Sequence, residues 1–347
     1  MSQNRYLFYA AQNYSYAILR PLQKAIRERG DDVAWFLAGK EINPDYLRND
    51  EVRLISIRQA KNYLPRAVFA PGNIVPDFFP GIKVGLFHGF DTRKWASDND
   101  DHYNIRGFFD LYCTQGPDTT TRFQQLAVQH GFFRVVETGW PKLDPMFSEN
   151  FTEVSHSKPI VLYSSTFSRR ATSAPQLLET IREVSRNDKY QWRVTFHPKM
   201  DKTIVDAYKN IQNENLKFIE TDNVIPLLLE ADVMLCDTSS ILQEYLVLGK
   251  PAVTFKNKQP EACMIDIQKP EELIPALDKA ISRPPELVKK IETYSERLHP
   301  YRDGQSSFRV LDAVDWFAEE GYKNLRPKPL NLIRKIKIRN KLGYYWK

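Results

Sequence analysis

Short hydrophobic runs alternate with amphipathic stretches along the first half of the chain, and each run has the length of a single strand. One amphipathic stretch, residues 16–29, predicts a helix that Gly30 ends. Strands that alternate with helical patterns are typical of a parallel sheet covered by helices. The expected strands of this half are residues 5–10, 33–37, 67–70, 83–87, 111–114 and 135–138.

A polar stretch at residues 148–158 interrupts this alternation, and we interpret it as an interdomain linker. The pattern then restarts and predicts an α/β protein of two consecutive doubly wound, Rossmann-like domains. We expect domains at residues 1–150 and 151–320 and a separate tail at residues 321–347. The expected strands of the second half are residues 160–163, 192–196, 216–219, 233–236 and 252–255. One helix of this half is expected after the strand at 160–163, with Pro175 at its first helical position. The other expected helices cover residues 223–230, 240–248, 271–281 and 285–298.

Composition narrows the class of protein. The chain has 347 residues, of which 42% are hydrophobic and 27% charged, as in ordinary globular proteins. No apolar run is long enough to span a bilayer, the N-terminus lacks the pattern of a secretory signal, and the three cysteines have no metal-ligand spacing. We therefore expect a cytoplasmic protein without a metal site.

The net charge of +6 belongs to the tail. Residues 321–347 contain nine basic residues and no acidic ones, which leaves 40 basic and 43 acidic residues in the body. The body is therefore slightly acidic, and the charge does not indicate a nucleic-acid-binding surface spread over the protein.

The segment 231–255 carries the strongest local signal. The strand at 233–236 runs into Asp237, Thr238, Ser239 and Ser240, and a helix follows. Hydroxyl groups, backbone N–H groups and the positive end of a helix dipole meet at this point, an arrangement that suits a phosphate. Ser240 and Gln243 also fit a capping box, which needs no ligand. The segment alone leaves both interpretations open.

Two histidines follow strands at the edge where open α/β sheets bind ligands. His88 comes after residues 83–87 and precedes Gly89, which would let a substrate approach closely. Its ordinary pKa near ~6.5 suits a general base at neutral pH. His197 follows residues 192–196, and Lys199 adds a positive charge that would favour a phosphate leaving group. A strand-to-loop turn with a surface lysine would explain the residues around His197 equally well.

Two further clusters suit anions. Ser164, Ser165 and Thr166 follow the strand at 160–163, and Arg169 and Arg170 come next. Hydroxyls beside guanidinium groups are typical of phosphate recognition. Gly304 and Ser306 lie in a turn before a helix expected near Phe308, where helix capping is the alternative explanation. Walker A, GxGxxG, HExxH and GxSxG motifs are all absent from the sequence.

Taken in order, these pieces resemble the CDP-glycerol glycerophosphotransferase family, the enzymes that prime and polymerise teichoic acids. The motifs that carry the resemblance are FHGF at 87–90, TGWPKLD at 138–144, LYSSTF at 162–167, FHPKMD at 196–201, DTSSILQEYLVLGKP at 237–251 and YRDGQSSFR at 301–309. The resemblance covers roughly residues 80–310. It implies a GT-B fold with an acceptor-side N-terminal domain, a nucleotide-donor C-terminal domain and a cleft between them.

The resemblance also implies roles for individual residues. His88 would be the base on the acceptor hydroxyl, and His197 would assist the departure of CMP. Ser239, Ser240, Gly304 and Ser306 would hold the donor diphosphate. No cofactor is implied beyond the CDP-polyol donor itself. The complete set of expected donor-binding residues is Ser164, Ser165, Thr166, Arg169, Lys199, Asp237, Thr238, Ser239, Ser240, Glu244, Asp303, Gly304 and Ser306.

The chain departs from the family pattern near both expected substrates. It reads FHGFDTRKW where the family is close to WHGTPLK, and SSTFSRR where the family is close to APTWR. The polyol and the acceptor therefore stay open. The alternatives to a polyol-phosphate transferase are a GT-B glycosyltransferase or epimerase using a UDP-sugar, and a non-catalytic binding protein on the same scaffold.

The basic tail fits a lipid-linked acceptor. Aliphatic residues interleave with its basic residues, and Tyr344, Tyr345 and Trp346 close the chain. Such a segment suits the surface of an anionic membrane, although a solvated basic terminus has the same composition. We therefore expect the protein on the inner face of the cytoplasmic membrane, attached peripherally through this tail.

Overall fold

The computed structural model describes residues 3–90, 101–148, 156–221 and 223–344. The chain forms two compact units. The first contains the described residues of 1–89, 101–148 and 299–347, and the second contains Phe90 and the described residues of 149–298. Each unit is built on its own parallel sheet of six strands.

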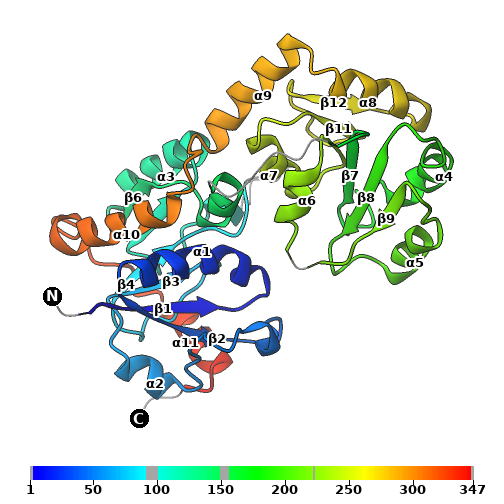
Figure 1. Cartoon of the computed structure of the whole chain (residues 1–347). Coiled ribbons are helices and arrows are strands. Elements are labelled where there is room, and N and C mark those ends of the chain that lie inside the picture. The colour runs from blue at the N-terminus through cyan, green and yellow to red at the C-terminus, as the bar shows by residue number, and fades with distance from the viewer. Residues whose placement is uncertain (1–2, 91–100, 149–155, 222, 345–347) are drawn as a thin grey trace. The chain divides into compact units, whose positions relative to one another are not determined.

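The sheet of the first unit has the strand order β2-β1-β3-β4-β5-β6, and the strands are visible in Figure 1. Neighbouring strands are parallel throughout, and β1 pairs Phe8 with Trp35 of β2. β1 to β5 are almost completely buried because helices and loops cover both faces. The strands are β1 (Arg5–Ala10), β2 (Asp32–Leu37), β3 (Ala67–Ala70), β4 (Ile82–Gly85), β5 (Leu111–Thr114) and β6 (Arg134–Glu137).

The helices of this unit come from both ends of the chain. Helix α1 buries one apolar face, and Gly30 follows it with a φ of +76°, the left-handed conformation that glycine adopts without strain. The longer helices are α1 (Tyr14–Glu28), α2 (Ile57–Asn62), α3 (Pro117–His130), α10 (Ser306–Trp316) and α11 (Leu332–Lys341). Arg29, just after α1, forms ion pairs with Asp312 and Asp315 of α10.

The sheet of the second unit has the order β12-β11-β10-β7-β8-β9 and is again parallel. Its central strands are β7 (Ile160–Ser165), β8 (Gln191–Phe196), β10 (Val233–Cys236) and β11 (Ala252–Phe255), flanked by β9 (Leu216–Phe218) and β12 (Met264–Ile267). Its helices are α4 (Ala174–Val184), α5 (Lys202–Asn210), α6 (Ile225–Glu230), α7 (Ile241–Val247), α8 (Leu273–Ile281) and α9 (Pro285–Leu298).

The predicted α/β class with two parallel sheets is confirmed, and several strands have the bounds that the sequence pattern predicts. β4 is shorter than the expected strand 83–87, because Phe87 takes a φ of +60° and leaves the strand conformation. The expected strands do not include β12, a four-residue strand at the edge of the sheet with only one buried residue.

The end of the chain differs from the expected division. Residues from His299 onward belong to the first unit, whereas the sequence pattern suggested a second domain up to residue 320 and a separate tail. The ion pairs of Arg29 with α10 join residues almost 300 positions apart, so the local pattern gives no sign of them. Among the described residues, no helix has both the length and the hydrophobicity that a membrane crossing requires.

Candidate active site

His88 lies in solvent just beyond the carboxyl end of β4. The preceding residue, Phe87, is buried in the hydrophobic core and holds the left-handed backbone conformation. That conformation costs a non-glycine residue roughly 1–2 kcal/mol, so the packing of the Phe87 ring must compensate for it. The ring of Tyr14 stacks on His88 with 5.5 Å between centroids and an interplanar angle of 27°. A strained turn thus directs an imidazole outward beside an aromatic ring.

Gly89 has the open surroundings that its expected role requires. A Cβ atom built at this position would meet no atom of the described residues within 4 Å. None of the described residues therefore excludes a larger side chain here, and as far as they show, the space beside His88 is open to a ligand.

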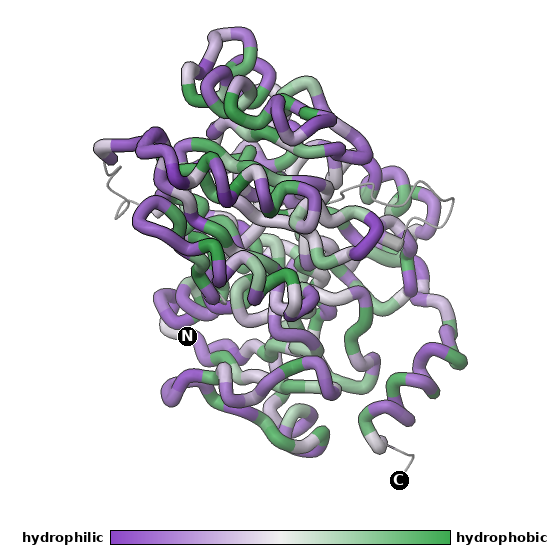
Figure 2. The backbone as a smooth tube through the Cα atoms, turned by 90° about the vertical axis from the view of Figure 1, so that its right-hand side faces the viewer, coloured by the Kyte–Doolittle hydropathy of each residue, from purple (hydrophilic) through white to green (hydrophobic). Residues whose placement is uncertain are grey.

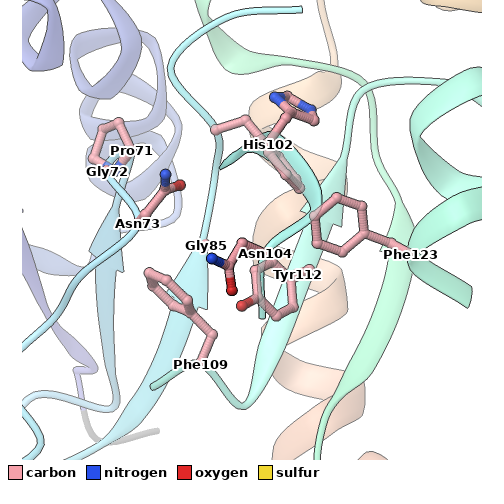
Figure 3. A pocket seen from close by; sticks show the side chains of 10 residues that line it. Pro71, Gly72, Asn73, Gly85, His102, Asn104, Phe109, Tyr112 and Phe123 are labelled. Atoms are coloured by element: carbon pink, nitrogen blue, oxygen red, sulfur yellow. The ribbon is translucent and has the colours of Figure 1, made fainter. Parts of the chain in front are cut away.

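A small hollow lies close to this turn, in the first unit (Figure 3). The amides of Asn73 and Asn104 and the rings of Phe109, Tyr112 and Phe123 surround it, and Phe87 and His102 complete the wall. None of the expected site residues lines this hollow. Residues 71–73 directly follow β3, so the search for polar side chains after strands could have found Asn73.

His197 lies beyond the carboxyl end of β8 in the second unit and is also exposed. Its Nδ1 accepts a hydrogen bond of 3.0 Å from the backbone N–H of Lys199. In the neutral imidazole the proton is therefore on Nε2, which makes that atom a hydrogen-bond donor. The ring of Phe167, itself 44% exposed, packs against the imidazole at 4.6 Å between centroids.

Asp237 organises the loop between β7 and α4 from its position after β10. Its fully buried carboxylate accepts hydrogen bonds from the Thr166 N–H (2.9 Å), the Ser173 N–H (2.9 Å), the Ser173 hydroxyl (3.0 Å) and the Ser165 hydroxyl. Burial raises the pKa of this carboxyl, and the hydrogen bonds oppose that shift. Asp237 and Ser165 thus hold the loop that carries Phe167 and Arg169.

The hydroxyl groups expected to bind the donor at this loop are buried, whereas the expected basic side chain is exposed. Ser164 and Thr166 are buried, whereas the Arg169 side chain is largely exposed and pairs with Asp201 at 3.1 Å. Asp201 also caps α5 by accepting a hydrogen bond from the Thr203 N–H. Lys199 is exposed on the preceding turn.

The hydroxyl-rich turn before α7 is partly open. Ser239 and Ser240 are half-buried, Thr238 is buried and accepts a hydrogen bond from the Lys258 N–H, and Glu244 is buried in the first turn of α7. Ser240 is the N-cap residue, but within the described residues its side chain makes no capping hydrogen bond. The capping-box interpretation of Ser240 and Gln243 is therefore wrong.

The turn before α10 belongs to the first unit, and there a carboxylate of the protein caps the helix. Asp144 accepts hydrogen bonds from the N–H groups of Ser306 (2.9 Å) and Ser307 (2.8 Å). Asp303 pairs with Arg309 and accepts from the Gln305 N–H. Gly304 has a φ of +65°, and a Cβ there would lie 3.1 Å from the Asp144 carbonyl oxygen. Helix capping thus accounts for this turn, and its expected role in donor binding stays a prediction.

His299 joins the same cluster, and sequence reasoning gave it no specific role. Its Nε2 accepts a hydrogen bond of 2.9 Å from the Trp140 N–H. Burial lowers the pKa of His299 from 6.5 to about 4, so the imidazole is neutral. Gly139 packs so closely here that a Cβ would lie 2.4 Å from the Ser306 hydroxyl oxygen. Within the described residues, no cluster of three His, Cys, Asp or Glu side chains is arranged to hold a metal.

Comparison with known proteins connects these motifs. The sequence profile of the family described as CDP-Glycerol:Poly(glycerophosphate) glycerophosphotransferase matches residues 88–315. The chain belongs to this family. A curated relative, the teichoic acid glycerol-phosphate primase of Bacillus subtilis (strain 168), is 25% identical over 254 residues, which cover 67% of this chain and 64% of that protein. The match therefore spans less than two thirds of that primase.

Solved structures agree on the fold. A variant of the wall teichoic acid polymerase TagF soaked with CDPG is 15% identical, with a TM-score of 0.66, and the match covers 92% of this chain and 90% of that chain. A putative UDP-N-acetylglucosamine 2-epimerase from Listeria monocytogenes is 13% identical, with a TM-score of 0.63, and the match covers 95% and 99%. The expected GT-B-like fold is confirmed. This fold alone does not distinguish the two activities.

The glycerophosphotransferase profile begins at His88 and ends inside α10. It therefore includes both exposed histidines, the turn before α7 and the Asp144-capped turn before α10. The two histidines lie in different units of the chain, and the hydroxyl-rich turns are likewise divided between them.

Proposed function

We propose that this glycerophosphotransferase-family protein transfers glycerol phosphate, or a related polyol phosphate, from a CDP-activated donor to a hydroxyl of a lipid-linked or saccharide acceptor. CMP would be released, and the product would belong to a cell-surface polymer. The observation that carries the proposal is the pair of exposed histidines, each at the carboxyl end of a strand, within a match to this family.

The proposed mechanism is an in-line attack on the β-phosphorus of the donor. His88 takes the proton of the acceptor hydroxyl as the acceptor oxygen forms its bond to phosphorus. The bond from the β-phosphorus to the bridging oxygen breaks, and CMP leaves with that oxygen. The Nε2–H of His197 is suited to donate to the leaving phosphate, because Nδ1 is already an acceptor. Catalysis would come mainly from positioning and charge stabilisation.

Donor binding is proposed for the second unit. Ser239 and Ser240 are half-buried and Arg169 and Lys199 are exposed, so these groups are accessible to a diphosphate. The relative TagF was studied with CDPG, which supports a CDP-linked donor. Asp237 and Ser165 would act indirectly by holding the loop, since both are buried and hydrogen-bonded to each other.

The test is release of CMP by the full chain incubated with CDP-glycerol or CDP-ribitol and a lipid-linked disaccharide. We expect His88→Ala to lower turnover by about 10²–10⁴-fold, the usual loss when a general base is removed. His197→Ala should also be severely impaired, whereas His197→Gln should keep part of the activity because its amide retains an N–H donor.

The control is His156→Ala, a histidine without a strand-end position, which should leave turnover unchanged. UDP release from a UDP-sugar, with no CMP from any CDP-polyol, would favour the glycosyltransferase or epimerase reading that the Listeria structure raises. Unchanged biological activity of both catalytic-histidine variants would favour a non-catalytic binding protein.

We also propose that the protein works at the inner face of the cytoplasmic membrane, where a lipid-linked acceptor would lie. The excess of basic residues in residues 321–347 supports this location, since each contributes about 1 kcal/mol near an anionic surface. Tyr345, Trp346 and Lys347 lie outside the described residues.

A further inference from the structure

The basic tail packs against the first unit along a defined path. The Arg326 N–H donates to the Gly131 carbonyl (2.8 Å), and Lys328 pairs with Asp110 at 2.6 Å. A Cβ at Gly107 would lie 2.7 Å from Pro329, so the tail fits closely over that glycine. These contacts fix residues 326–329, and with them the start of α11.

One face of α11 is committed to this packing. Ile338 is 6% exposed and belongs to the hydrophobic core cluster of the first unit. Lys335 and Arg339 both lie beside Asp77, with N···O distances of 3.9 and 3.4 Å. The Arg339 guanidinium also lies over the ring of Phe78. Residues 335, 338 and 339 thus form the inner face of the helix.

The opposite face of α11 is apolar and exposed. Figure 2 shows hydrophobic and hydrophilic residues alternating along the last helix before the C-terminus. Positions three and four apart share a helix face, which brings Leu332, Ile333 and Ile336 together. Soluble surfaces rarely gather large aliphatic side chains in this way unless a partner covers them. The exposed fractions are 76% for Leu330, 61% for Leu332, 72% for Ile333 and 51% for Ile336.

Basic residues border this apolar ridge. Arg334, Lys337 and Lys341 are exposed, and the sequence from 321 to 347 contains no acidic residue. A partner that matches this face must therefore be anionic and also accept branched aliphatic side chains. A nucleic acid offers anionic phosphates, but it is bound mainly through basic and polar contacts to them and, in single strands, through stacking on aromatic residues, which gives an aliphatic ridge little to contact. An anionic lipid bilayer offers a negative surface over hydrocarbon and matches both properties.

We propose that the outer face of α11, formed by Leu332, Ile333, Ile336, Arg334, Lys337 and Lys341, is an interfacial membrane-binding surface for anionic lipid, together with Leu330 just before the helix. The inner face holds the helix on the first unit, so the apolar ridge is presented as a rigid surface and not as a loose basic tail. The inference deepens the proposed function by assigning its membrane attachment to one face of one helix.

The test measures binding of the full chain to vesicles of equal parts phosphatidylglycerol and phosphatidylcholine by sedimentation. We expect Ile333→Gln with Ile336→Gln to weaken binding by about tenfold or more, because each isoleucine loses its burial in hydrocarbon. We expect Lys337→Gln with Lys341→Gln to weaken binding by about tenfold at low salt, and less at high salt. Vesicles of phosphatidylcholine alone should bind the wild type weakly.

The matched control replaces two exposed aliphatic residues elsewhere on the first unit, Ile55→Gln with Val128→Gln, which are 75% and 85% exposed. This double variant should bind vesicles like the wild type. Unchanged vesicle binding by the two α11 variants, or an equal loss in the control, would overturn the proposal. So would loss of a dimer, or of binding to duplex DNA, in the α11 variants without loss of vesicle binding.

Point variants are sharper than deletion of residues 324–347, because deletion would also uncover the core around Ile338. Thermal melting checks that each variant is folded. Turnover with a water-soluble acceptor should be unaffected by the α11 substitutions. Wild-type vesicle binding without CMP release from any CDP-polyol would contradict the proposed function and support the membrane-binding surface. CMP release by a wild-type protein that does not bind vesicles would contradict the membrane-binding surface and support the proposed function.

Discussion

Gly89 is the residue whose replacement separates folding from substrate binding most cleanly. An added Cβ meets no atom of the part of the chain that the structure describes within 4 Å, so Gly89→Ala should keep the melting temperature of the wild type. A methyl group beside His88 would displace a closely approaching acceptor, and a misplacement of about 1 Å can cost ~10²-fold in rate. We expect CMP release to fall by at least about tenfold.

Gly249 provides the matched control. No atom of the described ranges lies within 4 Å of an added Cβ at Gly249 either, but its φ is +73°, a conformation that alanine adopts only with strain. Gly249→Ala should therefore lose about 1 kcal/mol of stability while retaining turnover in the fully folded protein. Full activity of Gly89→Ala would show that no substrate group approaches the space beside His88.

The sequence predicts only some of the residues and contacts of the candidate site. His88 and His197 were found because both directly follow a hydrophobic run, and the structure places both at strand ends in solvent. The pairing of Asp144 with the N–H groups of Ser306 and Ser307 was not found, since it joins residues more than 160 positions apart. The orientation of the His197 ring likewise depends on a backbone contact that a sequence does not show.

At the scale of elements, the loop between β7 and α4 depends on one carboxylate, that of Asp237, which directly follows β10. Asp237→Ala would leave the N–H groups of Thr166 and Ser173 without their acceptor in a buried setting. We expect a loss of about 2–4 kcal/mol in the free energy of unfolding, measured by urea denaturation. The KM for the CDP-linked donor should rise as well, because the same loop carries Arg169 and Phe167.

Asp232 is the control for this prediction. It accepts a hydrogen bond from the Ile160 N–H at the opposite end of β7, at 2.7 Å, and it is solvent-exposed. Asp232→Ala should cost about 1 kcal/mol and leave the KM for the donor unchanged. An unchanged KM in Asp237→Ala, measured where that variant is fully folded, would contradict the proposed link between the loop and the donor.

The elements themselves were mostly predictable. Strands such as residues 67–70 and 233–236 are short apolar runs between turn residues, and the structure gives them the expected bounds. The sequence pattern failed where packing decides the conformation. Phe87 leaves the strand because its ring packs into the core, and β12 lies at a sheet edge with little buried surface.

At the scale of the whole molecule, His299 makes stability depend on pH. The unfolded histidine binds a proton below about its ordinary pKa of 6.5, whereas the folded imidazole stays neutral down to about 4. In that window the unfolded state binds more protons, so the free energy of unfolding falls as the pH falls. We expect a loss of about 2 kcal/mol between about pH 7 and about pH 5 from this residue.

His299→Gln should flatten this dependence, because glutamine does not titrate and its amide oxygen can still accept from the Trp140 N–H. The measurement compares urea denaturation of the two proteins at both pH values. Asp144 and Asp237 have raised pKa values, which shift stability with the opposite sign, so only the difference between the proteins reports on His299. Equal slopes for the two proteins would rule out this role.

The division of the chain into two units was the feature that the sequence predicted least well. The two α/β halves follow from the alternation of strands and helices, but the return of the chain at His299 does not. That return depends on contacts such as Arg29 with Asp312 and Asp315, whose partners come from opposite ends of the sequence. Charge composition marked residues 321–347 as unusual, but only the structure divides the basic residues of α11 between an inner and an outer face.

The three-segment construction of the first unit sets an order for folding during synthesis. All residues of the second unit precede His299, so the ribosome has released them before α10 and α11 emerge. The first unit then still lacks the partners of Arg29, Asp77 and Asp144, and part of its core stays uncovered. The N-terminal half of this protein is thus made first and completed last. All strands of its sheet are present early, but a nascent chain must keep the partly covered sheet from aggregating until α10 and α11 arrive.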